Sequence, residues 1–174
     1  MIPLAIRTIR QLIIWEYAGI LPAFQSGQRN DWLQSVRNYD QLSSNDEKWR
    51  HILYEAVKID PNRCAYCGSE EELSVTYIVP RQVCSAAEAH NIVRVCRKCN
   101  ISKGAQDLIK WWGAGKRNKL PAAVLGKYLK ILYLCHECNG TLDDYALNEE
   151  GRVDILYPGY LFAGPCSEEK ERIT

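Results

Sequence analysis

The stretch "CAYCGSEEELSVTYIVP", residues 64–80, decides the fold. Two cysteines separated by two residues come first, acidic turn residues follow, and a β-branched run ends at Pro80. A second pair with the same spacing lies downstream in "VCRKCN". A two-residue spacer lets both sulfurs of a pair face one point, so two pairs complete a tetrahedral thiolate site. The ligands that this spacing predicts are Cys64, Cys67, Cys96 and Cys99.

The ion expected in this site is Zn²⁺, and its expected role is structural. Four thiolates leave no coordination position open, so such an ion stabilises the fold and does not activate water. Gly68 follows the first pair, where a turn often needs a positive φ. The alternative interpretation is a set of four reduced, buried thiols without metal.

The residues after each cysteine pair have the pattern of a small mixed fold. β-Branched content and length predict one strand over 73–79 and a second over 91–95. In the first strand we expect Val75, Ile78 and Val79 to belong to the core.

Helical periodicity accounts for most of the remaining chain. Apolar residues at helical spacing predict helices over residues 3–20, about 45–59, 99–113 and 121–138. Pro3 suits a first turn, and Ser44 with Glu47 has the spacing of a capping box. The segment "DWLQSVRNYDQL" fits a short helix or a loop, and the tail after Gly140 fits a small hairpin or an irregular cap.

These elements predict an α+β fold with a zinc-stabilised ββα core and flanking N- and C-terminal helices. The expected parts are an N-terminal helical extension (1–60), a zinc-binding module (61–113), and a C-terminal helix and tail that pack on the module (114–174).

Composition and charge indicate a globular protein with one basic segment. Hydrophobic residues make up 47% of the 174 residues and charged residues 25%, and the net charge is +1. Between His90 and Lys130, however, ten Lys and Arg residues face a single acid, Asp107. Such asymmetry favours a polyanionic partner for this segment, and the alternative is a solvated helical face.

The eight cysteines require a reducing compartment if they are to bind metal. The apolar start "LIIWEYAGILPA" is interrupted by Glu16 and lacks a small-residue cleavage site, and no apolar run approaches membrane-spanning length. We therefore expect a cytoplasmic protein without a membrane partner.

A third cysteine pair does not fit the zinc pattern. Cys135 and Cys138 lie near the end of the last predicted helix, with no fourth pair after them. Cys84 and Cys166 would complete a second site by residue type alone. We favour the interpretation that Cys135 and Cys138 are helix-packing or exposed thiols.

The order of these motifs resembles the HNH endonuclease family. The order is a cysteine knuckle, a strand ending in Pro80, a loop, "NIV" at 91–93, the second knuckle, and "NISKG" at 100–104. Further segments resemble a bacterial subfamily, namely "WEYAG" near the N-terminus and "DLIKWW", "LPAAVLGKYLKILY" and "HECNGTLD" after the module. The resemblance therefore covers most of the chain, and it implies a ββα unit around one catalytic metal.

The resemblance also exposes a gap in the catalytic motif. In the family, an adjacent Asp-His pair on the first strand supplies a metal ligand and the general base; these positions fall on Thr76 and Tyr77. Asn91 matches the central asparagine that orients the histidine, and Asn100 matches the second metal contact on the helix. Threonine is a poor ligand for a hard cation, and tyrosine, with a reference pKa of about 10, is a weak base. Mg²⁺ or Mn²⁺ is therefore expected only if the site is active.

Substitutes for the missing groups are few. His90 precedes Asn91 and is a minor candidate for the base, and Tyr77 as a covalent nucleophile is a weaker one. We expect Tyr77 to pack in the vacated site or to stack on a base.

The expected partner is nucleic acid, in particular DNA. Arg94, Arg97, Lys98 and Lys103 surround the second knuckle and the following helix, where they would contact phosphates. Three interpretations follow: a catalytically degenerate binder, a nuclease that uses substitute or partner-supplied residues, and a scaffold in a defence or mobile-element complex. The sequence leaves open whether the protein is an enzyme.

Overall fold

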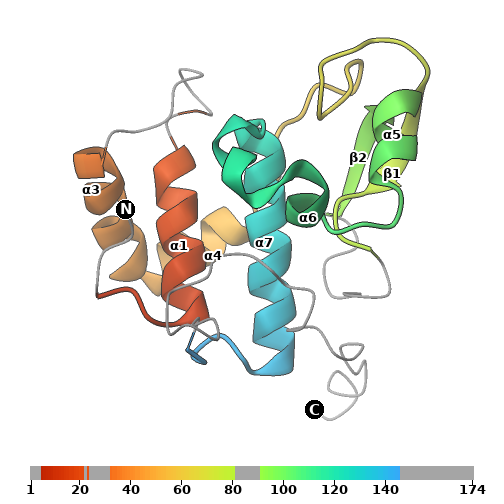
Figure 1. Cartoon of the computed structure of the whole chain (residues 1–174). Coiled ribbons are helices and arrows are strands. Elements are labelled where there is room, and N and C mark those ends of the chain that lie inside the picture. Colours follow the sequence, from red (N-terminus) through yellow and green to blue (C-terminus); the bar gives the residue numbers. More distant parts are fainter. Residues whose placement is uncertain (1–4, 22, 24–31, 81–90, 146–174) are drawn as a thin grey trace, which may run out of the picture.

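A helical body and a smaller ββα module lie side by side in the computed structural model (Figure 1), which describes residues 5–21, 23, 32–80 and 91–145. The body contains α1 (Ile9–Ile20), α3 (Trp32–Ser43), α4 (Asp46–Tyr54) and α7 (Ala122–Asn139). The module contains β1 (Leu73–Tyr77), β2 (Ile92–Cys96), α5 (Arg97–Lys103), α6 (Leu108–Trp112) and the 3₁₀ helix η2 (Ala114–Lys119). The predicted α+β class is confirmed. No helix in the described ranges is long and apolar enough to cross a membrane.

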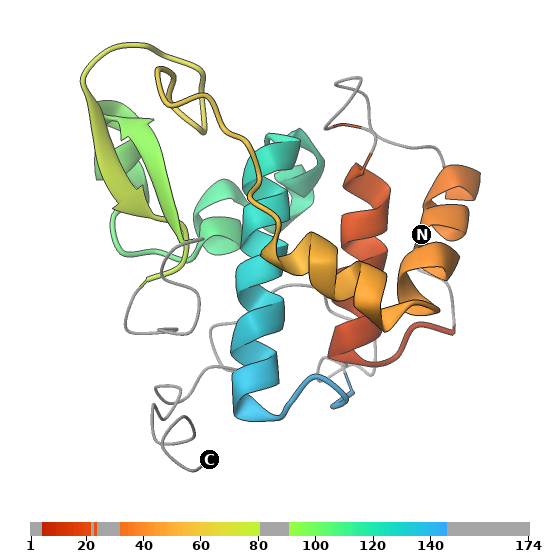
Figure 2. The ribbon, with the colours of Figure 1, turned by 180° about the vertical axis from the view of Figure 1, so that it is seen from behind.

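The body is organised around α7, which runs between the other helices and the module (Figure 1). α1 packs against both α3 and α7, and α4 crosses from α3 towards α7 on the side seen in Figure 2. Three aromatic rings from different helices meet edge to face: the Trp49 centroid lies 5.4 Å from that of Tyr17 and 5.3 Å from that of Tyr133. Edge-to-face packing of this kind adds to the energy of simple burial.

The module is a two-stranded antiparallel hairpin with α5 on one face. Side chains alternate between faces along a strand, and Thr76 pairs with Val93 while Ser74 pairs with Val95. Both valines are buried, so Ser74 and Thr76 share the inner face. Val75 lies on the other face and is 59% exposed, which corrects its predicted place in the core.

One predicted helix start and one predicted cap are wrong, and local capping explains both. α1 begins at Ile9 because Thr8 and Gln11 form a capping box in which each side chain bonds the other residue's backbone N–H. Residues 5–7, predicted as helix, precede this cap, and residues 1–4 lie outside the described part. α4 begins after Asn45, whose side chain accepts from the backbone N–H of Lys48, so the predicted Ser44 and Glu47 box is not used.

The end of α4 is set by a residue from a distant helix. The predicted helix to residue 59 stops at Tyr54. The buried Lys130 of α7 donates from Nζ to the carbonyls of Ile52 and Glu55, the latter at 2.6 Å. These contacts satisfy carbonyls that would otherwise be unpaired at a helix C-terminus.

The predicted helix over 99–113 is divided into two. Gly104, with φ of 50°, ends α5, and the Asp107 side chain caps α6 by accepting from the backbone N–H groups of Ile109 and Lys110. The long C-terminal helix is confirmed as α7, and Gly140 in the left-handed conformation ends it. The ambiguous segment at 31–42 contains α3. The loop at 82–89, His90 and the tail after residue 145 lie outside the described residues.

Candidate metal centre and the adjacent face of the hairpin

The four predicted zinc ligands come together at one end of the hairpin. Their Sγ atoms all lie within 4.8 Å of one another, and those of Cys67 and Cys96 are 3.6 Å apart. A tetrahedron with Zn–S bonds near 2.3 Å has edges of about 3.8 Å, so the cluster fits Zn²⁺. Within the described ranges, no other group of three or more His, Cys, Asp or Glu side chains is close enough to hold a metal.

Backbone hydrogen bonds shape the first knuckle. The N–H of Gly68 donates to the carbonyl of Cys64 at 2.8 Å, and the N–H of Cys64 donates to the carbonyl of Ser69 at 2.7 Å. Gly68 has φ of 77°, as its position after the first pair predicts. The N–H of Ala65 donates to the carbonyl of Arg94 and so ties the first knuckle to β2.

The electrostatics of the cluster favour a thiolate at one cysteine. Burial by itself raises the pKa of the Cys64 thiol, but hydrogen bonds from the backbone of Cys96, Cys67 and Tyr66 outweigh it and lower the pKa to about 6. Burial and then the neighbouring thiols raise the pKa of Cys99. When bound, Zn²⁺ would supply the positive charge that keeps all four sulfurs deprotonated.

Thr76, where the resemblance expects the metal-binding aspartate, lies on the face of β1 that is turned towards α5, which we call the Thr76 face. Asn100 on α5 donates from Nδ2 to Oγ of Ser74 at 3.2 Å, so its side chain faces the same side of β1 as Thr76. Tyr77 is the last residue of β1 and lies on the opposite side of the strand, partly buried. The structure therefore brings Thr76 and Asn100 to one face of β1 and Tyr77 to the other.

Asn91, the position of the central asparagine in the resemblance, bonds to the backbone just beyond β1. Its side chain is buried, and it makes a paired contact with the backbone of one residue. Oδ1 accepts from the N–H of Val79, and Nδ2 donates to the carbonyl of Val79, both at 2.8 Å. Asn91 therefore fastens the chain where it leaves β1, two residues beyond Tyr77.

Lys103 is a correction to the predicted phosphate-binding surface. It is only 2% exposed, and its Nζ donates to the carbonyl of Tyr77 at 2.9 Å. Burial lowers the pKa of Lys103, and the charge of Asp107 partly opposes that effect. A lysine that is enclosed and used in this way holds α5 against β1 and does not reach a phosphate.

Asp107 is a polar residue at the junction that sequence reasoning did not single out. Besides capping α6, its Oδ2 accepts from the Tyr128 hydroxyl of α7 at 3.0 Å. Tyr128 is fully buried, so this bond satisfies a hydroxyl inside the interface between module and body. The signal in the sequence was a lone acid in a basic segment.

An aromatic cluster ties α6 to the first knuckle. The Trp111 ring packs edge to face on Tyr66, with centroids 4.9 Å apart, and on Trp112 at 5.5 Å. Trp111 donates from Nε1 to Ser102 Oγ, and Trp112 donates to the carbonyl of Lys116. Both tryptophans therefore have structural partners within the module.

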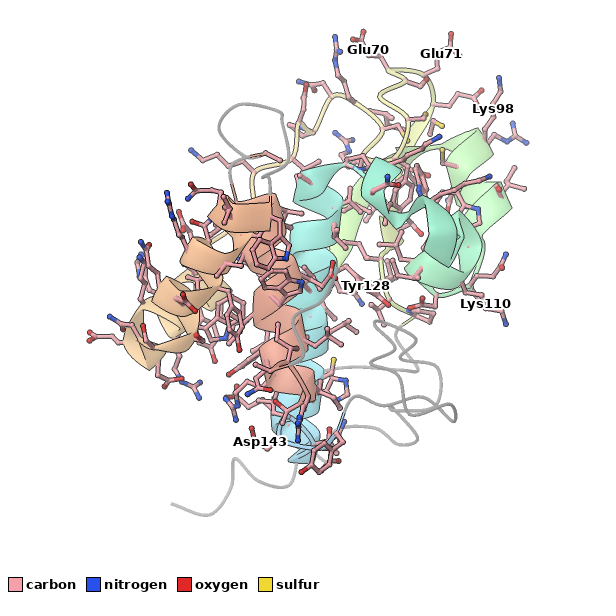
Figure 3. All side chains as sticks on the ribbon, turned by 60° about the vertical axis from the view of Figure 1, so that its left-hand side comes forward. Glu70, Glu71, Lys98, Lys110, Tyr128 and Asp143 are labelled. Carbon is pink, nitrogen blue, oxygen red and sulfur yellow. The ribbon has the colours of Figure 1, made fainter. Side chains whose placement is uncertain are left out.

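The other predicted phosphate contacts are exposed, and they differ in how they are engaged. Arg94 donates to the carbonyl of Pro61 at 3.2 Å, and Arg97 lies 3.9 Å from a carboxylate oxygen of Glu72. Lys98 has no salt bridge within the described residues and points away from the body, as does Lys110 of α6 (Figure 3).

The third cysteine pair divides into two unlike residues. Cys138 is an exposed, free thiol, in line with the interpretation favoured above. Cys135 is fully buried in α7 and is disulfide-bonded, so the expectation of a thiol is wrong there.

An antiparallel hairpin followed by a short helix, with two CxxC knuckles at one end, defines a metal-stabilised ββα module. Residues 64–107 match the sequence model of a family described as HNH endonuclease. A segment of 83 residues is 34% identical to the CRISPR-associated endonuclease Cas9 of Corynebacterium diphtheriae, and it covers 45% of this chain and 7% of that protein. The similarity to the HNH endonuclease family therefore lies in this module and does not extend to most of the matched Cas9. No solved structure matches the chain.

Proposed function

We propose that this protein binds duplex DNA through its HNH-type module and does not cleave it efficiently. The observation that carries the proposal is the set of side chains on the Thr76 face of β1, opposite α5. Thr76 stands at the position of the metal-binding aspartate and faces the same side as Asn100, whose amide is bonded to Ser74. The resemblance supplies the expectation of a carboxylate and an imidazole, and Thr76 and Tyr77 offer neither.

The chemical consequence is a large loss of rate. Without a carboxylate, the Thr76 face binds Mg²⁺ or Mn²⁺ weakly, because these hard cations prefer charged oxygen ligands. Tyrosine at neutral pH is protonated and accepts a proton poorly. General base catalysis alone contributes about 10²–10⁴-fold, and the metal stabilises transition-state charge in addition.

The DNA-binding surface that we propose is narrower than the basic segment of the sequence. Lys103 and Lys130 are buried and bonded to backbone carbonyls, and Lys127 donates to the carbonyl of Ile92. The exposed lysines of α5, α6 and η2 have no salt bridge within the described residues. They are Lys98, Lys110, Lys116 and Lys119. Glu70 and Glu71 lie at the tip of the knuckle turn and border this surface (Figure 3).

The first experiment tests for cleavage. Wild-type protein is incubated with supercoiled and linear DNA in Mg²⁺, Mn²⁺ or Zn²⁺, beside the Asn100→Ala variant. We expect no product above background from either protein. Cleavage by wild type that Asn100→Ala abolishes would instead show a working site completed by other residues.

The second experiment tests for binding. Affinity for a duplex should fall steeply with salt, because each phosphate contact releases counterions. Lys98→Ala combined with Lys110→Ala should reduce the slope of log K against log salt by about 2, since each contact contributes about 0.9. Lys48→Ala, a change of an exposed lysine on α4 of the body, is the matched control and should leave the slope unchanged. Binding without salt dependence, or no binding, contradicts the proposal.

A further inference from the structure

The outer face of α5 presents an exposed apolar side chain among cations. Ile101 is 71% exposed. On a helix, residues three and four positions apart are neighbours, so Lys98 and Arg97 flank Ile101 on its N-terminal side. Both cations are exposed, and Arg97 lies 3.9 Å from a carboxylate oxygen of Glu72 on the surface. The isoleucine is therefore surrounded by positive charge on this side of the helix.

On the C-terminal side of Ile101, the next residues along the chain after α5 are small. Gly104 ends the helix and Ala105 follows it, and both are exposed. Ile101 is thus the projecting apolar group on this end of the module. An isolated exposed apolar residue needs no explanation by itself, so the argument depends on its charged setting.

The setting is complementary to a polyanion. Residues 97–119 carry seven Lys and Arg against one acid, Asp107. That acid is largely enclosed, and it is bonded to Tyr128 and to the first turn of α6. Its charge is therefore held inside the junction, while the charges of Lys98 and Lys110 point to solvent (Figure 3).

The other exposed apolar surface of the module is different. Val75 and Ile92 lie on the open face of the hairpin, opposite α5. Among the described cations of this face, Arg94 donates to the carbonyl of Pro61 and Lys127 donates to the carbonyl of Ile92. Val75, 59% exposed, is therefore a matched apolar residue whose described cationic neighbours are bonded to backbone carbonyls.

We propose that Ile101 inserts between base pairs from the minor groove of duplex DNA, while Lys98 and Arg97 contact the phosphates on either side. This inference rests on the proposed DNA binding and adds the mode of contact. Apolar side chains flanked by Lys or Arg are the means by which proteins unstack a base step and bend the duplex. Flexible pyrimidine–purine steps lower the energy of such a bend, so the preferred substrate is a duplex that contains a TA step.

The experiment compares Ile101→Ala with Val75→Ala and Lys98→Ala. Alanine has a high helix propensity, so Ile101→Ala should keep α5 intact, which circular dichroism checks. Each protein is titrated onto a duplex with a central TA step and onto one with an A-tract, over a range of salt. Donor and acceptor dyes at the duplex ends report the bend by energy transfer.

We expect Ile101→Ala to weaken binding to the TA duplex by roughly tenfold, from the apolar contact that it removes, and to reduce the bend. Its salt slope should equal that of wild type, since no charge changes. Lys98→Ala should lower the slope, and Val75→Ala should match wild type. If wild type binds no duplex, both proposals fail. If wild type binds and Ile101→Ala binds and bends DNA as well as Val75→Ala does, this inference alone is wrong.

Discussion

The two ends of the ββα module differ in how many of their residues match those expected from the resemblance to the HNH endonuclease family. At the knuckle end, all four sulfurs are in place and lie within 4.8 Å of one another. At the other end of β1, about 10 to 15 Å away along the strand, Thr76 and Tyr77 stand where an acid and a base are expected. Asn91 and Asn100 are present there, and both bond to other groups of the module.

This difference separates two uses of metal in one small fold. A closed thiolate site contributes folding free energy, whereas an open site of oxygen ligands contributes to catalysis. Loss of the second therefore leaves the first unaffected. A protein that needs only the shape and the charge of the module must keep the knuckle cysteines, whereas its catalytic residues can be replaced.

The strongest way to break the comparison is to remove the knuckle metal. The purified protein should contain about one Zn²⁺ per chain, and Cys64→Ser or Cys99→Ser should unfold the module. Structural zinc is worth roughly 10–16 kcal/mol in small finger peptides, which equals the stability of a whole domain. Elemental analysis and hydrogen exchange of residues 64–107 measure both effects.

Cys138→Ser is the matched control for the zinc experiment, because Cys138 is an exposed, free thiol outside the cluster. It should change neither zinc content nor exchange. A folded protein without metal would contradict the structural role of the knuckle, and a second zinc per chain would show that cysteines outside the cluster also bind.

An intermediate effect is expected at Asn91. Its substitution tests whether the stability of the module depends on the polar contacts at the end of β1. Asn91→Ala leaves the buried N–H and carbonyl of Val79 without partners, which should cost about 2–5 kcal/mol in the free energy of unfolding. Asn100→Ala removes one partly buried bond and should cost about 0.5–1.5 kcal/mol. Urea denaturation of both variants gives the two values. Equal costs would show that the paired contact of Asn91 has no special weight.

The smallest expected effect is a restored DNA-nicking activity at the Thr76 face. Thr76→Asp with Tyr77→His should give weak Mn²⁺-dependent nicking of supercoiled DNA, about 10²-fold above wild type, since the general base and a metal ligand return together. Thr76→Asp alone should raise Mn²⁺ binding, because it faces the same side as Asn100. A titration followed by electron paramagnetic resonance measures that binding.

Adding Asn100→Ala to the double variant is the control, and it should remove the nicking. Tight Mn²⁺ binding without nicking would show that a residue at position 77, on the opposite side of β1, cannot act on a metal bound at the Thr76 face. The placement of positions 76 and 77 on opposite faces of the strand would then explain the proposed loss of activity better than the missing carboxylate does.

The parts of the fold that could be predicted are those that local sequence determines. The spacing of the cysteines predicts the cluster, and the positions of Pro121 and Gly140 predict the bounds of α7. Both follow from a few adjacent residues. The class of the fold follows from these elements in their order along the chain.

The parts that were predicted wrongly depend on contacts between distant residues. Charge gives Lys98 and Lys103 the same expected role, yet Lys103 faces the carbonyl of Tyr77 and is buried. The end of α4 depends on Lys130, whose contact with Glu55 spans 75 positions in the chain. No local pattern marks such partners, because a lysine reads as solvent-exposed until the fold encloses it.

The contact of Lys130 with the end of α4 also has a consequence for the order of events during synthesis. α4 leaves the ribosome long before α7 does, so its last carbonyls wait for a partner that has not been made. The pairing of Arg10 with Asp143, 2.8 Å apart, delays α1 in the same way. The knuckles, by contrast, need only a short later stretch of chain. The module can therefore close around zinc while the helical body, although it begins first, is completed last.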